Sequence, residues 1–262
     1  MNKALCLLIS LLFLNNFLQA QISPPGLGDA NTAFWSAFGV KRNLDSLGNK
    51  QTLSYVAIGR KSSPDNENLF SKQAIVVLNH EVYHSFDPHQ QYGYAISYRR
   101  QPKYESEAPY EKEGTEQEFR LYGRYAYTFN FGEKWKFKNT IRQEFRKFFD
   151  ADFHDVDEDF QLRTRLKSQV TYHLSQKNNQ KLALSVEELF SASYLNEPTA
   201  KWTSFGYREM RIAAYYIFNI PNSPFTVDIG YMDDLIRDSK SIHKGGVHYF
   251  AADLVWNLPY NK

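Results

Sequence analysis

The chain has 262 residues and a formal net charge of +2, and 16% of its residues are aromatic, with 18 tyrosines and 20 phenylalanines. A charge this close to zero, spread along the chain, gives no reason to expect nucleic acid as a partner. The single cysteine, Cys6, lies within the first twenty residues, so the rest of the chain can form no disulfide and no thiolate site.

Residues 1–20 have the layout of a cleavable signal peptide. One cation, Lys3, precedes an apolar run over residues 4–14, which is shorter than the roughly twenty residues of a membrane-spanning helix. The alternative is a retained N-terminal anchor. We expect residues 1–20 to be removed on export, residues 21–31 to form a leader, and residues 32–262 to form one β-barrel domain.

Beyond the leader, apolar and polar residues alternate with the period of a β-strand. The alternating segments lie at residues 32–43, 50–61, 69–84, 90–101, 115–130, 134–149, 159–174, 181–192, 203–218, 225–236 and 246–258. Several exceed the roughly nine to eleven residues with which a tilted strand crosses a bilayer. Single-chain bacterial barrels have even strand numbers. The sequence therefore predicts an all-β fold, an antiparallel transmembrane β-barrel of 10 or 12 strands, with twelve preferred.

The segment Phe160–Leu174 shows the alternation most clearly, because one face is mainly apolar and the other carries Arg163, Arg165 and Lys167. A soluble ligand-carrying barrel would turn the apolar face inward, whereas a membrane barrel turns it outward. Strand length and the aromatic residues that end the apolar faces favour the membrane barrel. Short connections such as residues 219–224 alternate with long ones such as residues 102–114, as in bacterial barrels with short periplasmic turns and long outer loops.

The stretches EQEFRLYGRYAYTFNFGEKWKFKNTIRQEFRKFF (116–149), DFQLRTRLKSQVTYHL (159–174) and LALSVEELFSASY (182–194), followed by REMRIAAYYIF and FTVDIGYMDD, resemble a bacterial outer-membrane barrel family known as domain of unknown function 2490. The resemblance implies an outer-membrane β-barrel without an established activity, so it transfers no catalytic residue. The C-terminus departs from the usual aromatic ending of such barrels. Trp256 and Tyr260 are the candidates for a closing-strand signal.

Charged residues collect on the polar faces of successive segments. The candidate interior-lining residues are Arg120, Arg124, Arg142, Glu144, Arg146, Arg163, Arg165, Lys167, Glu187, Glu209 and Arg211. They could line a narrow pore or hold an anionic solute through forked guanidinium contacts. They could also pair with one another and fill a small barrel, which is the arrangement that we expect.

The residues His80, Glu81 and His84 match the H-E-x-x-H pattern of zinc metalloproteases. In a helix the two histidines would lie about 6 Å apart along the axis, but in a strand they span roughly 13 Å, too far for one zinc ion. The β-branched residues of this stretch favour a strand. We therefore expect a hairpin here and no metal site.

The sequence gives weaker signals for two other chemistries, acyl hydrolysis and calcium binding. Seven histidines and many serines provide no motif that selects a Ser–His pair for an acyl hydrolase. The acidic stretch Asp150–Asp159 offers carboxylates for calcium but lacks the ligand spacing of an EF-hand, so a solvated loop is expected.

The sequence thus predicts an exported protein of the cell outer membrane that acts as a small passive pore or as a structural or binding barrel. We expect no catalytic residues, no metal and no cofactor. The expected partners are outer-membrane lipid and a small solute in the interior, without nucleic acid and with no protein partner indicated. The alternatives are a secreted zinc hydrolase using His80, Glu81 and His84, or a soluble ligand-carrying barrel.

Overall fold

The computed structural model describes residues 22, 24–27, 30–175, 178–196, 198–236 and 246–259. The expected signal peptide at residues 1–20 and Tyr260 lie outside these residues. Within them the chain forms strands and no α-helix, so no helical segment there has the length and apolarity to cross a membrane. The all-β prediction is confirmed.

The twelve strands correspond to the eleven alternating segments plus one short addition. They are β1 (Thr32–Asn43), β2 (Lys50–Lys61), β3 (Lys72–Ser85), β4 (Gln90–Tyr104), β5 (Lys112–Phe131), β6 (Trp135–Phe149), β7 (Glu158–Ser175), β8 (Gln180–Leu195), β9 (Lys201–Trp202), β10 (Gly206–Asn219), β11 (Phe225–Ile236) and β12 (Gly246–Leu258). The addition is β9, whose two residues pair with the end of β8.

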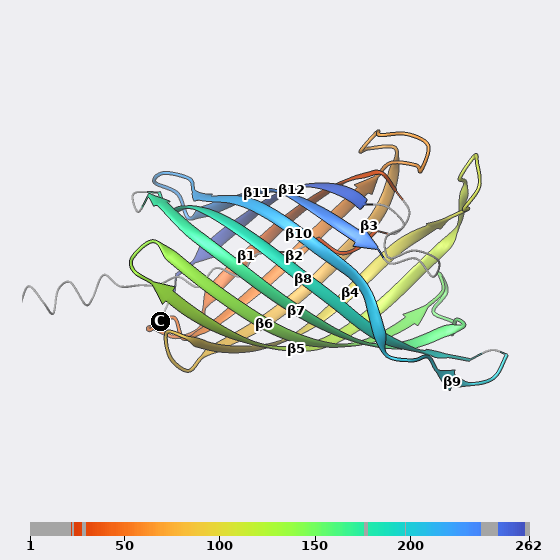
Figure 1. The fold of residues 1–262 in the computed structure, drawn as a ribbon, viewed down its shortest axis with the longest axis horizontal. Helices are drawn as coiled ribbons and strands as arrows, with labels where there is room; N and C mark the ends of the chain where they lie inside the picture. The colour runs from red at the N-terminus through yellow and green to blue at the C-terminus, as the bar shows by residue number, and fades with distance from the viewer. Residues whose placement is uncertain are drawn as a thin grey trace, which may run out of the picture.

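Eleven of the described strands close into one barrel, in which β8 pairs directly with β10 and β12 pairs with β1 (Figure 1). All pairs in this ring are antiparallel except β1 with β12, which run in the same direction from Thr32 opposite His248 to Arg42 opposite Leu258. An even number of strands was expected. The sheet has twelve strands, but the ring has eleven, and a ring with an odd number of such strands must contain one parallel pair.

The leader adds a further pass of the chain to this ring. Leu27 lies beside Gly59 of β2, near the start of β1, whereas Ile22 lies beside Gly39, farther along β1. The described leader therefore runs inside the barrel alongside β1 and in the opposite direction. It adds one pass through the interior to the eleven strands of the wall.

Short and long connections separate to opposite ends of the barrel. The short connections, at residues 44–49, 86–89, 132–134 and 220–224, form one end, which we call the turn end. Gly48 and Gly132 have φ angles of 71° and 63° in two of these turns, a conformation that glycine adopts without a Cβ clash. Longer connections, such as residues 62–71 and 150–157, form the loop end.

On β4–β8 the mainly apolar face points outward and the mainly polar face points inward. On β7, Leu166 is 42% exposed, while its neighbour Arg165 is 3% exposed. The interior has two different halves. Apolar residues of β1–β3 and β10–β12, including Trp35 and Tyr249, pack with Ile22 and Leu27 of the leader. Inward charges concentrate on the other half, from β4 to β8.

Candidate functional site: the charged interior

The predicted interior-lining residues all lie on inward positions of β5–β8 and β10. The buried ones are Arg120, Glu144, Arg146, Arg165, Glu187, Glu209 and Arg211, and the half-buried ones are Arg124, Arg142, Arg163 and Lys167. Period-two alternation explains this placement, because residues two apart on a strand share a face. Neighbouring strands then bring their charges side by side.

Glu144 is the centre of the first group of ion pairs. Its carboxylate is completely buried and lies 2.9 Å from Nη1 of Arg120, 2.7 Å from Nη2 of Arg142 and 3.3 Å from Nη1 of Arg165. Arg120 also donates from Nε to Glu118 at 2.6 Å. One acid therefore joins cations from β5, β6 and β7.

Glu118 forms the second group toward the loop end. Arg146 donates from Nε at 2.9 Å and from Nη2 at 2.8 Å to the two oxygens of Glu118, which is a forked contact. Arg146 also donates to the side-chain oxygen of Gln161 on β7. These side-chain contacts connect β5, β6 and β7 near the loop end.

A third group connects the charged half to the leader. Arg165 donates from Nη2 to Glu187 at 2.5 Å, and Arg211 lies 3.9 Å from the same carboxylate. Arg211 also pairs with Glu209 and donates to the backbone oxygen of Pro24 at 3.1 Å. The guanidinium of Arg211 therefore holds both the wall and the leader.

Glu81 is an interior residue that the sequence pattern had associated with metal chemistry. Its carboxylate accepts hydrogen bonds from Tyr83, Tyr122, Asn79 and Arg124. These donors come from β3 and β5, so Glu81 connects these two strands across β4.

The H-E-x-x-H residues do not converge. His80 and His84 lie on the outer face of β3, opposite to Glu81. Nδ1 of His80 is 2.8 Å from Oγ of Ser54, and the ring of His84 stacks on Tyr92 at 4.7 Å between centroids. The strand predicted for this stretch is confirmed, and it directs the acid and the imidazoles to opposite sides.

The Ser54–His80 pair is also the arrangement that an acyl hydrolase would start from. The surface around it on the outer wall is lined by apolar side chains such as Phe38, Leu78 and Ile96, and by no carboxylate. Asn79 also lines this surface, but its side-chain amide donates to Glu81 and accepts from Tyr122 in the interior.

Three acids of the acidic stretch after β6 are bound by neighbouring groups. Asp150 accepts the backbone N–H groups of Asp152 at 2.8 Å and His154 at 2.9 Å, and the hydrogen bond from His154 lowers the pKa of Asp150. Lys147 pairs with Asp155 at 2.8 Å and with Asp159. Within the described residues, no three His, Cys, Asp or Glu side chains gather in a way that could hold a metal ion.

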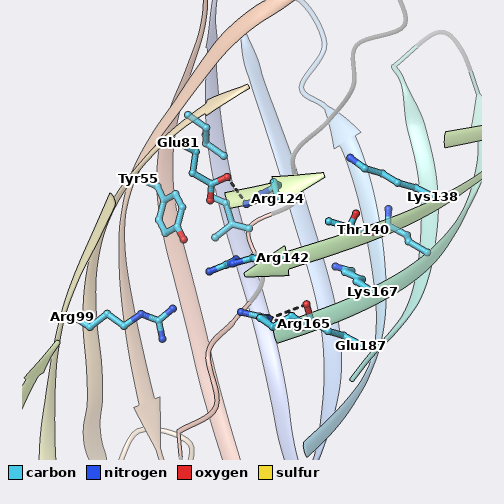
Figure 2. A pocket seen from close by; sticks show the side chains of 13 residues that line it. Tyr55, Glu81, Arg99, Arg124, Lys138, Thr140, Arg142, Arg165, Lys167 and Glu187 are labelled. Atoms are coloured by element: carbon cyan, nitrogen blue, oxygen red, sulfur yellow. Dashed lines mark hydrogen bonds and ion pairs between the residues drawn. The ribbon is translucent and has the colours of Figure 1, made fainter. Parts of the chain in front are cut away.

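A cavity of about 70 Å³ lies between the ion pairs and the leader (Figure 2). The residues that line it are Ile22, Leu53, Tyr55, Glu81, Arg99, Arg124, Lys138, Thr140, Arg142, Arg165, Lys167, Gln169 and Glu187. Six of these are cations and two are acids. The cavity therefore carries an excess of positive charge in its lining.

Sequence reasoning did not select several of these interior residues, namely Glu81, Arg99, Glu118, Lys138 and Asp234. The alternation does contain a signal for them, because each shares the face of polar residues that point inward on its strand. Glu81 was assigned to a metal motif, and Arg99 has no charged neighbour two residues away on its strand, whereas Lys138 has Lys136.

Comparison with known families shows that residues 41–243 match the model of a family described as Protein of unknown function (DUF2490). The match covers the charged strands β4–β8 completely. The resemblance inferred from the sequence is confirmed. Among curated proteins, no match to the chain is found.

Proposed function

This chain belongs to the DUF2490 family of proteins of unknown function, and we propose that it is a β-barrel of a Gram-negative outer membrane with a closed interior that binds a solute rather than conducting one. Export would use residues 1–20 as the signal peptide. The turn end would face the periplasm and the loop end the outside, as in other bacterial barrels.

The outer surface supports the membrane placement. Large apolar side chains on the wall are between about two fifths and three fifths exposed, among them Ile58, Leu121, Ile141, Leu184 and Ile212. Monomeric soluble proteins rarely expose apolar surface over such a continuous area. At mid-strand the charges lie mainly inside, although Glu188 lies on the outer face, and this is the reverse of a soluble ligand-carrying barrel and typical of a membrane barrel.

The filled interior carries the proposal of a closed barrel. Ile22 and Leu27 of the leader are 2% and 0% exposed, and they pack against Trp35, Ile75 and Tyr249. On the other half, ion pairs centred on Glu144 and Glu187 occupy the space. Porins of 16 to 18 strands leave an aqueous channel, whereas barrels of about eight strands are filled by side chains. This eleven-stranded barrel resembles the filled class.

Cell fractionation and bilayer recording test the two parts of the proposal separately. The mature protein should fractionate with outer membranes and show heat-modifiable mobility in detergent gels, and a soluble periplasmic product would overturn the placement. In planar bilayers the purified protein should give no sustained conductance. A stable open current that disappears when the preparation is denatured would instead identify a passive pore.

A further inference from the structure

We propose that the cationic cavity binds a small free oxyanion of the phosphate or sulfate class. This deepens the proposed binding role and rests on it. Figure 2 shows Arg99 of β4, Arg142 of β6, and Arg165 and Lys167 of β7 around the cavity. Some cations of this lining pair with acids of the protein, and others do not.

The two acids of the lining are fully engaged with the protein. Glu81 accepts hydrogen bonds from two tyrosines, an asparagine and Arg124, and Glu187 holds Arg165 through two bonds of 2.5 and 3.1 Å. Glu144, an interior residue that does not line the cavity, engages Arg142 and Arg165. These carboxylates are therefore already engaged, and two further cations of the lining, Arg99 and Lys138, make no ion pair with them.

Arg99 and Lys138 are the cations of the lining with the fewest contacts to acids. Within the described residues, neither makes an ion pair with a carboxylate, and Nε of Arg99 is buried without a hydrogen-bond acceptor. Nε of Arg142 is also buried without an acceptor. A buried cation without a partner is costly, so an anion that supplies several acceptor oxygens would be stabilised here.

The geometry and size of the site suit a compact oxyanion. Guanidinium groups from β4, β6 and β7 present forked donors that match the oxygens of phosphate or sulfate. Thr140, Tyr55 and Gln169 add neutral donors to the same lining. Since one water needs at least about 10 to 15 Å³ of such space, 70 Å³ holds roughly five water-sized groups. A sugar or nucleotide would exceed this space, whereas a tetrahedral oxyanion fits it.

The test measures unfolding of the full mature chain, refolded in a non-ionic detergent without phosphate. Sodium phosphate or sulfate is titrated against sodium chloride at equal ionic strength. The wild type should be stabilised saturably by the oxyanions. Arg99→Gln and Lys138→Gln should each weaken the apparent affinity about tenfold or more, because each removes a charge-assisted hydrogen bond.

Lys41→Gln is the matched control, since Lys41 is an interior lysine that does not line the cavity. Its anion response should equal that of the wild type. Without added oxyanion, Arg99→Gln should be at least as stable as the wild type, because it removes a half-buried charge that makes no ion pair with a described carboxylate. That result separates a ligand-binding role from a merely structural one.

Three results would overturn the proposal. The first is an equal, unsaturated response in all variants, which is a general salt effect. The second is that Arg99→Gln is less stable than the wild type by the same amount with and without the anion. The third is stabilisation by a lipid with a phosphate headgroup but not by inorganic phosphate. A protein that fractionates with outer membranes yet ignores oxyanions would refute this inference alone and leave the membrane placement standing.

Discussion

The hydroxyl of Tyr249 on β12 accepts the backbone N–H of Leu27 at 2.8 Å, so the wall of the barrel holds the leader directly. Both groups are buried, and neither can turn to water when the contact is lost. The leader is therefore bound by polar contacts as well as by apolar packing.

The first prediction is that Tyr249→Phe lowers the free energy of unfolding by about 1–3 kcal/mol, because the N–H of Leu27 is left buried without an acceptor. Denaturant titration of the refolded barrel measures this. As a control, Tyr125→Phe removes a hydroxyl that contacts Gln90 at an exposed site, and should change stability by less than about 0.5 kcal/mol. Equal effects in both variants would show that the leader contact is not special.

The strands could be predicted from the sequence, and the leader could not. Alternation fixes which residues share a face, so Arg165 and Leu166 were correctly placed on opposite faces of one strand. The leader has no such period. Its buried position depends on contacts with residues far along the chain, such as Leu27 with Tyr249, 222 residues away. The sequence pattern therefore gave no sign of the extra pass that the leader makes inside the eleven-stranded ring.

The charged interior was predicted in part for a similar reason. The period of two identifies Arg142 and Glu144 as neighbours on one face, but it does not give the register between strands. That register decides that Glu144 meets Arg120 and Arg165. The excess of cations around the cavity emerges only when acids are assigned to their partners in space.

A second prediction uses two outward positions that lie directly opposite each other. Ile141 faces Tyr125 and Leu166, whereas Leu166 faces Ile141 and the acid Glu188. If the wall faces lipid near the bilayer midplane, Ile141→Arg should cost about 2–4 kcal/mol. Leu166→Arg should cost less, because the carboxylate of Glu188 is within reach.

Refolding titrations into lipid vesicles measure both variants. Leu166→Arg combined with Glu188→Gln is the control, and it should return the cost to that of Ile141→Arg. Near-neutral effects of both arginines would mean that this surface is in water, which contradicts the membrane placement.

A third prediction concerns the central acid of the interior. Glu144→Gln keeps the shape of the side chain but leaves Arg120, Arg142 and Arg165 without their shared negative charge. Breaking a buried ion pair from one side costs about 3–5 kcal/mol. The denaturation midpoint should fall accordingly.

The matched control for this change is Glu116→Gln, which breaks a surface pair with Lys103 at 3.0 Å. Exposed pairs contribute about 0–1 kcal/mol, so the control should change the denaturation midpoint very little. If the two variants lose similar stability, the interior network does not hold the barrel together.

A fourth prediction concerns pH and the acidic loop. Hydrogen bonds to the charged carboxylate, first from the N–H of His154, lower the pKa of Asp150 below its ordinary value of 3.8. A lowered pKa stabilises the loop above the ordinary value, and this stabilisation is lost as the pH falls through the lowered one. Amide exchange at Asp152 and His154, corrected for intrinsic rates, should stay slow from neutral pH to about 4 and accelerate below it. In Asp150→Asn it should be fast throughout, and slow exchange in that variant would refute the capping role.

The last prediction separates the two readings of the H-E-x-x-H stretch. Because Glu81 is tied to Arg124 and two tyrosines inside the barrel, Glu81→Gln should destabilise the fold strongly, by several kcal/mol as for other buried pairs. His84→Ala removes an outward ring and should cost far less. A metalloprotease motif would give the reverse, since its histidines hold zinc and its glutamate acts only in the reaction. Zinc per purified chain should be substoichiometric in the wild type and unchanged in His84→Ala. Stoichiometric zinc that is lost on this substitution would mean that β3 does not keep its strand conformation in solution.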